Sequence, residues 1–282
     1  MPSHRRAARA VAARAGGTAP VPAGGCNRWT RLAAALVTVA TFGACSGSGG
    51  DRADGSGMEG TVTVFAAASL TDALTEVAGA FETAHPGATV ELNLAGSQAL
   101  REQILAGAPA DVFAPAAATE MDSVAEAGEI AGEPRVFART TLEIVVPAGN
   151  PADVDGLADF ADDDLLVGLC AVEVPCGHLA RQALERAGVS PRPDTDEPDV
   201  RSLLAKVAAG ELDAGIVYRP DVLAGGDSVE GVEVSDDVNV VTDYSAAALA
   251  RAPEPALAGA FVDFLVSGDG RAIVTSFGFG AP

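Results

Sequence analysis

The chain has 282 residues and is 48% apolar, enough for one large or two ordinary α/β domains with a substantial core. Residues 1–44 hold six arginines and no acid, so the remaining 12 basic residues face all 39 acidic residues. This excess of negative charge argues against nucleic acid and anionic lipid surfaces as partners, although high acidity often serves solubility alone.

The N-terminal residues 1–44 have the pattern of a lipoprotein-type signal peptide. Arg28 and Arg31 flank the start of an apolar stretch, residues 32–43, that is too short to span a bilayer. Small residues then lead to Cys45, as in a bacterial lipobox, although Phe42 stands where leucine is usual. We therefore expect an extracytoplasmic protein, anchored to the outer face of the cell membrane by a lipid on Cys45. The long segment before Cys26 fits either an extended signal or a start codon assigned too early.

A tether is expected to follow the anchor over residues 45–60. This stretch is rich in Gly, Ser and Asp and has no apolar periodicity, which is typical of a flexible linker. A linker of this length and composition spans about 20–25 Å on average. It would hold a globular domain, expected over residues 61–282, close to a membrane surface.

The first half of that domain alternates apolar runs with amphipathic segments, which predicts a β-α-β-α-β unit. We expect strands at 61–65, 89–94 and 110–116, and helices over 70–85, 97–108 and 118–128. Such an order favours an open parallel sheet with helices on both faces.

The second half repeats this alternation around a Pro/Asp-rich loop at 193–200. We expect strands at 141–149, 165–170, 213–218 and 238–249, helices over 177–188 and 201–210, and two last helices within 254–279, broken at Gly268. Two half-size α/β lobes are the natural interpretation, with ligand sites at the carboxyl ends of the strands. The expected lobe 1 comprises about 61–138 and 244–282, and lobe 2 about 139–243.

Two cysteines remain after Cys26 and Cys45 are assigned to the signal and the anchor. Cys170 and Cys176 are spaced for a small closed loop, and disulfides persist in exported proteins, so the pair favours a disulfide. A metal site is the alternative, but only His178 is nearby, and two thiols with one histidine form an incomplete ligand set.

A stretch of small residues and one hydroxyl, "FAAASLTDAL" at 65–74, stands where a strand passes into a helix. Small side chains let a ligand approach the unpaired N–H groups of a first helical turn, which favours an anion site. An ordinary helix start is the alternative, since Ser69 and Asp72 fit a capping box and Ser97 fits a plain N-cap.

Four stretches in order resemble the molybdate-binding periplasmic proteins of ABC transporters: "TVFAAASLTDAL", "AGSQALREQILAGAPADVF", "VPCGHLARQAL" and "PDVRSLLAKVAAGELDAGIVY". The ending "SFGF" is also similar, so the resemblance covers nearly all of residues 61–282. It implies a type II periplasmic-binding-protein fold, with two α/β lobes joined by two crossovers and a tetrahedral oxyanion in the cleft between them.

The resemblance also implies a ligand shell of five residues, Ser69, Ser97, Cys176, Val200 and Tyr218. Cys176 and Val200 would contribute backbone N–H groups, and the other three would contribute hydroxyls. Helix N-termini carry partial positive charge, so an acidic protein could hold a dianion without Lys or Arg in the shell. Taken singly, Val200 is more typical of a buried helix residue and Tyr218 of a core aromatic.

The implied ligand is molybdate, and also tungstate, delivered to an ABC permease and its ATPase by a monomeric binding protein with no cofactor and no directly coordinated metal. Another oxyanion such as sulfate is the alternative. A surface lipoprotein without a transport role, or an enzyme built on Cys176 and His178, is more remote. Residues two apart on a helix face different sides, and the chain has no H-E-x-x-H or Walker motif, so no catalysis is expected.

Overall fold

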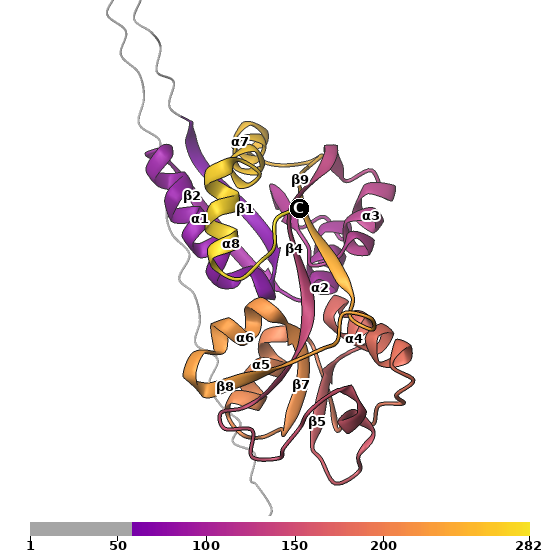
Figure 1. Cartoon of the computed structure of the whole chain (residues 1–282). Helices are drawn as coiled ribbons and strands as arrows, with labels where there is room; N and C mark the ends of the chain where they lie inside the picture. Colours follow the sequence, from indigo (N-terminus) through magenta and orange to yellow (C-terminus); the bar gives the residue numbers. More distant parts are fainter. Residues whose placement is uncertain (1–57) are drawn as a thin grey trace, which may run out of the picture. The chain divides into compact units, whose positions relative to one another are not determined.

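The computed structural model describes residues 58–282 (Figure 1). The predicted signal peptide, the predicted lipidation site Cys45 and most of the predicted tether lie outside this range. Strand β1 (Glu59–Ala67) begins with Glu59 paired in parallel to Gly87. The tether boundary predicted at residue 60 is therefore two residues late, because the sheet already includes Glu59.

The first sheet has the order β2 (Gly87–Ala95), β1, β3 (Val112–Ala114), β9 (Val241–Leu249) and β4 (Ile130–Pro147). Strands β2, β1 and β3 are parallel, whereas β9 pairs antiparallel with both β3 and β4. The parallel arrangement predicted for the first three strands is confirmed, but the antiparallel strand β9, which comes from the far end of the chain and lies beside β3, was not predicted to lie there.

Helices cover both faces of this sheet because its strands are apolar on both sides. In β1, Val64 packs into the same core as Leu74 of α1 (Thr71–Ala84) and Phe261 of α7 (Pro255–Leu265), beside α8 (Gly268–Ser276). Its neighbour Phe65 points the other way, against Leu100 of α2 (Ser97–Leu105) and residues of α3 (Ala118–Glu126). Alternate side chains of β1 therefore pack against helices on opposite faces of the sheet.

The second sheet shares β4 with the first. Strands β7 (Ala214–Tyr218) and β8 (Val229–Glu233) pair antiparallel with β4, and β5 (Val167–Cys170) lies parallel between β7 and β6 (Thr195–Glu197). Helices α4 (Pro175–Arg186), α5 (Val200–Ala208) and α6 (Arg219–Gly225) pack against it. Three 3-10 turns complete the fold, at Ala68–Leu70, Leu157–Ala161 and Gly226–Ser228.

Strand β4 passes from one sheet into the other, so the fold has two lobes, as Figure 1 shows. Thr141 still pairs with Val241 of β9, and the next residue, Leu142, pairs with Tyr218 of β7. We call residues 58–141 and 241–282 the first lobe, and residues 142–240 the second lobe. The chain returns to the first lobe after residue 240. Just before that point, the Asn239 side chain accepts a hydrogen bond from Leu142 N at 3.1 Å and donates one to Leu142 O at 2.9 Å, so it links the two segments that cross between the lobes.

The predicted elements correspond to observed ones, but several short elements were missed. β4 begins at Ile130, well before the predicted 141, and β6 lies within the region expected to be a loop. Helix α6 and strand β8 were not predicted, because they are short and carry little apolar periodicity. Within residues 58–282, no helix combines the length and apolar character needed to cross a membrane.

Candidate anion-binding site

The five predicted ligand residues line one small cavity between the lobes. Ser69 and Ser97 come from the first lobe, and Cys176, Val200 and Tyr218 come from the second. All five are buried, with at most 4% of any of them exposed. The cavity is very small, with a volume of about 10 Å³. The space therefore suits one compact ligand of a few atoms, not an organic metabolite.

Ser69 lies in a 3-10 turn between β1 and α1, not at the N-cap of a helix. The N-cap residue of α1 is Leu70, and no side chain caps that helix. The Ser69 hydroxyl is instead 2.9 Å from the hydroxyl of Tyr244, a fully buried residue of β9. The capping-box alternative for Ser69 and Asp72 is therefore wrong, and Tyr244 is a neighbour that sequence reasoning missed.

Ser97 is the first residue of α2, and Gly96 occupies the N-cap position. Its Oγ accepts a hydrogen bond from the backbone N–H of Ala116 at 3.1 Å, so it does not cap its own helix. The N-cap alternative for Ser97 is thus also wrong. An accepting hydroxyl keeps its own proton for donation.

The second lobe presents two helix N-termini to the cavity. Helix α4 begins at Pro175, and α5 begins at Val200 behind the N-cap Asp199. The first turn of a helix carries N–H groups without intrahelical partners and a partial positive charge. At the start of α4, a side chain on Gly177 would come within 2.1 Å of the Ala171 carbonyl oxygen, so only glycine allows this close approach.

A disulfide joins Cys170, at the end of β5, to Cys176 in the first turn of α4. Both cysteines are buried, and their Cα atoms are 6.0 Å apart. The sulfur of Cys176 is therefore neither a nucleophilic thiol nor a metal ligand. Among residues 58–282, no cluster of His, Cys, Asp and Glu is arranged to hold a metal ion.

Tyr218 ends β7 and is almost completely buried, yet within the described residues its hydroxyl has no hydrogen-bond partner. Its ring packs edge-to-face on Tyr244, with centroids 6.0 Å apart. Burial raises the pKa of both tyrosines well above the ordinary value. Both side chains therefore stay as neutral hydroxyls that can donate hydrogen bonds.

None of the residues that line the small cavity is Lys or Arg. One acid, Asp199, lines it, but its carboxylate is turned to its own helix. It accepts from Ser202 N at 2.9 Å and from Ser202 Oγ at 3.0 Å. The remaining polar groups are hydroxyls and helix N-termini, which together favour a small, fully deprotonated oxyanion.

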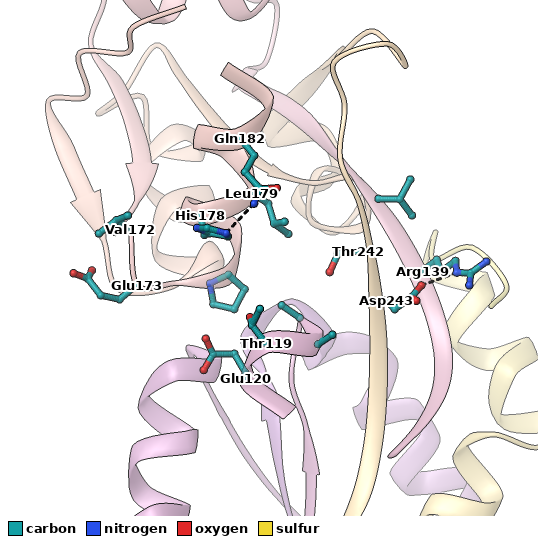
Figure 2. Close-up of a pocket in the computed structure, with 14 residues that line it drawn as sticks. Thr119, Glu120, Arg139, Val172, Glu173, His178, Leu179, Gln182, Thr242 and Asp243 are labelled. Carbon is teal, nitrogen blue, oxygen red and sulfur yellow. Dashed lines mark hydrogen bonds and ion pairs between the residues drawn. The ribbon is translucent and has the colours of Figure 1, made fainter. Parts of the chain in front are cut away.

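A larger cavity of about 690 Å³ borders the small one and shares Pro175 with it. Figure 2 shows Thr119 and Glu120 of α3 on one side and His178 and Gln182 of α4 on the other. This cavity has acids and bases on its walls, including the ion pair between Arg139 Nε and Asp243 Oδ1 at 2.6 Å. The first turns of α3 and α4 also reach it, but Glu120, Glu173 and Asp243 outnumber Arg139 on its walls, so its charge disfavours an anion.

Two α/β lobes with a small cavity between them are typical of solute-binding proteins, in which closure of the lobes buries the ligand. A family model described as "Bacterial extracellular solute-binding protein" matches residues 62–280. The chain belongs to this family of solute-binding proteins, and the expected fold of two α/β lobes is confirmed.

The chain is also similar to three individual proteins. The molybdate-binding protein ModA of Mycobacterium tuberculosis is 38% identical over 260 residues, which cover 90% of this chain and all of the relative. The solved periplasmic molybdate-binding protein of Azotobacter vinelandii has a TM-score of 0.70 at 20% identity, covering 78% of this chain and 99% of its own. The sulfate-binding protein SubI of M. tuberculosis also has a TM-score of 0.70, at 18% identity, with coverage of 78% and 86%.

Proposed function

We propose that this protein captures molybdate, and also tungstate, outside the cytoplasm and delivers it to an ABC transporter. The observation that carries the proposal is the cavity itself, where Ser69, Ser97 and Tyr218 meet the N-termini of α4 and α5 without any cationic side chain. The 38% identity to a molybdate-binding protein supports the choice of ligand. In the proposed shell, the amides of Cys176 and Val200 complete the set of donors.

The protonation state of the ligand follows from this donor set. At neutral pH molybdate, tungstate and sulfate are dianions without a proton, whereas phosphate carries at least one. Asp199 is the one acid that lines the cavity, and its carboxylate oxygens are occupied by Ser202. A protonated oxyanion would therefore find no free carboxylate to accept its hydrogen, so phosphate should bind poorly.

Sulfate is the second candidate, because the fold is equally similar to that of a sulfate-binding protein. Sulfate has the same charge and shape as molybdate but shorter bonds, so a cavity sized for molybdate would leave its donors out of reach. Isothermal titration of the mature protein with molybdate, tungstate, sulfate and phosphate tests both candidates. We expect tight binding of the first two, and a clear preference for sulfate would overturn the molybdate assignment.

The remaining parts of the proposal concern location and partners. We propose that residues 1–44 are removed, that Cys45 carries the lipid, and that the tether from residue 45 holds a monomeric domain near the membrane. An ABC permease and its ATPase would then receive the ligand. The family of extracellular solute-binding proteins and the lipobox-like residues before Cys45 support this arrangement.

A further inference from the structure

An ion pair joins the two lobes beside the anion cavity. Asp72 lies in the first turn of α1 in the first lobe, and Arg201 lies in the first turn of α5 in the second. Arg201 Nη2 is 2.5 Å from Asp72 Oδ2. Arg201 directly follows Val200, which lines the anion cavity, and both members of the pair line a neighbouring cavity that includes Ser69. The pair therefore spans the interlobe gap next to the ligand.

Arg201 lies beside a buried acid of its own lobe. Its Nε is 3.4 Å from Oδ1 of Asp221, a residue of α6 whose side chain is completely buried. The other oxygen of Asp221 accepts a hydrogen bond from the backbone N–H of Tyr218 at 3.3 Å. Asp221 thus connects Arg201 to the segment that carries a proposed ligand hydroxyl.

We propose that Arg201 is a positioning residue for lobe closure, and that the Asp72–Arg201 ion pair is a latch that holds the lobes together around the bound anion. This inference rests on the proposed function. Asp221 stays beside Arg201 in every arrangement of the lobes, because both lie in the second lobe. Asp72 reaches Arg201 only when the lobes are together, so the latch stabilises the closed form alone.

Contacts that exist only in the closed form alter the affinity for the ligand and the rate of its release, whereas contacts present in both the open and the closed form do not. A partly exposed ion pair contributes little free energy to the closed form, so loss of the latch should weaken molybdate binding only about two- to fivefold. Most of that change should be a faster release of ligand. The exposed fractions of the side chains, 26% for Arg201 and 45% for Asp72, place the pair in this range.

The test uses two substitutions on the first lobe, Asp72→Asn and Asp72→Lys, in the whole mature protein. Removing the charge should weaken molybdate binding about two- to fivefold, and reversing it should weaken binding further, with the melting temperature of the unliganded protein unchanged. Both variants leave Arg201 beside Asp221, whereas substitution of Arg201 would leave a buried acid without its partner and risk unfolding.

Asp196→Asn is the matched control. Its partner Arg181 is 2.6 Å away, the two side chains are 55% and 28% exposed, and both lie in the second lobe. Stopped-flow release of molybdate from Asp196→Asn should match the wild type. Equal release rates in Asp72→Asn, Asp72→Lys and Asp196→Asn would overturn the latch.

Failure of the proposed function would look different, because the wild type itself would then bind none of the four oxyanions. In that case, small-angle X-ray scattering of the unliganded proteins tests the latch. It predicts a larger radius of gyration for Asp72→Lys than for Asp196→Asn, and equal radii would overturn it.

Discussion

The hydroxyls of Ser69 and Tyr244 lie 2.9 Å apart, although 175 residues separate them in the chain. One belongs to the turn after β1 and the other to β9, the strand on which the chain re-enters the first lobe. Tyr244 is fully buried among Phe137, Tyr218 and Phe279 and cannot turn away easily. The proposed ligand hydroxyl of Ser69 is therefore oriented by a rigid aromatic cluster.

Ser69→Ala should weaken molybdate binding about ten- to a hundredfold, because a hydrogen bond to a charged group contributes about 1.5–3 kcal/mol. Tyr244→Phe keeps the serine hydroxyl but removes its support, so the loss of affinity should be smaller. Calorimetric titration measures both. If Ser69→Ala binds as well as the wild type while its melting temperature falls, the serine is structural and the proposed site is wrong.

Gly96→Ala should hinder lobe closure. A Cβ atom on Gly96 would lie 2.7 Å from the Pro198 carbonyl oxygen, which belongs to the other lobe, and 2.6 Å from Oε1 of Gln98. The φ angle of Gly96 is −58°, so alanine is acceptable to the backbone itself. Overpacking of about 1–3 kcal/mol in the closed form alone should lower affinity about five- to a hundredfold.

Titration and thermal melting together check the Gly96 prediction, with Gly79→Ala as control. A Cβ atom on Gly79 meets nothing within 4 Å. A Gly96→Ala protein that binds normally, or that is destabilised without ligand, would contradict the expectation that only closure is affected.

Asp221 should make the protein less stable as the pH rises from about 4 to about 7. Burial raises the pKa of Asp221 to about 7 from 3.8, although Arg201 and the Tyr218 amide oppose the shift and Asp72 and Asp199 add to it. Between these two values the folded state holds a proton that the unfolded state has lost. The free energy of unfolding therefore falls with rising pH, by about 4 kcal/mol over the window for this group alone.

Asp221→Asn should remove this slope, because the amide does not titrate. Urea unfolding of the unliganded protein at several pH values between 4 and 7.5 measures it, and Asp227→Asn, on an exposed turn nearby, serves as control. The prediction fails if the wild type and Asp221→Asn lose stability in parallel.

The double variant Cys170→Ala, Cys176→Ala should lower the free energy of unfolding by about 2 kcal/mol, since a loop this short is inexpensive to close in the unfolded chain. Chemical denaturation measures the change, with the reduced wild type as a second comparison. A thiol assay on the folded mature protein should find no free cysteine in residues 58–282. Two reactive thiols there would contradict the disulfide.

Cys45→Ser should release the protein from the membrane, because it removes the residue proposed to carry the lipid. Fractionation of cells that express both forms, with mass spectrometry of the mature N-terminus, measures this directly. An unchanged membrane fraction would show that another segment provides the anchor.

The local patterns of the sequence predict most of the helices and strands, because each has a clear apolar period. They do not predict that β9 lies antiparallel between β3 and β4, since that position depends on where the chain returns after the second lobe. Strand β6 and helix α6 are short and held by tertiary contacts, so their own residues give little indication of them.

The proposed site was predictable as a set of residues but not as a set of interactions. The resemblance names Ser69 and Ser97, and the structure brings them together with the second-lobe residues. Their hydrogen-bond partners, Tyr244 and the Ala116 amide, come from other strands and loops and have no local signature. The Asp72–Arg201 pair likewise depends on how two lobes meet, which no short stretch of sequence encodes.

The two crossings between the lobes have a mechanical consequence. Strand β4 leaves the first lobe at Thr141, the chain returns to β9 at Val241, and these two residues are paired. Asn239 ties the returning chain to Leu142 beside them. Two adjacent, paired strands bend together more readily than they slide or twist against each other, so we expect the lobes to rotate mainly about this pair of crossings. A small bend at Thr141 and Val241 would then give a larger displacement at the distant rim of the cleft.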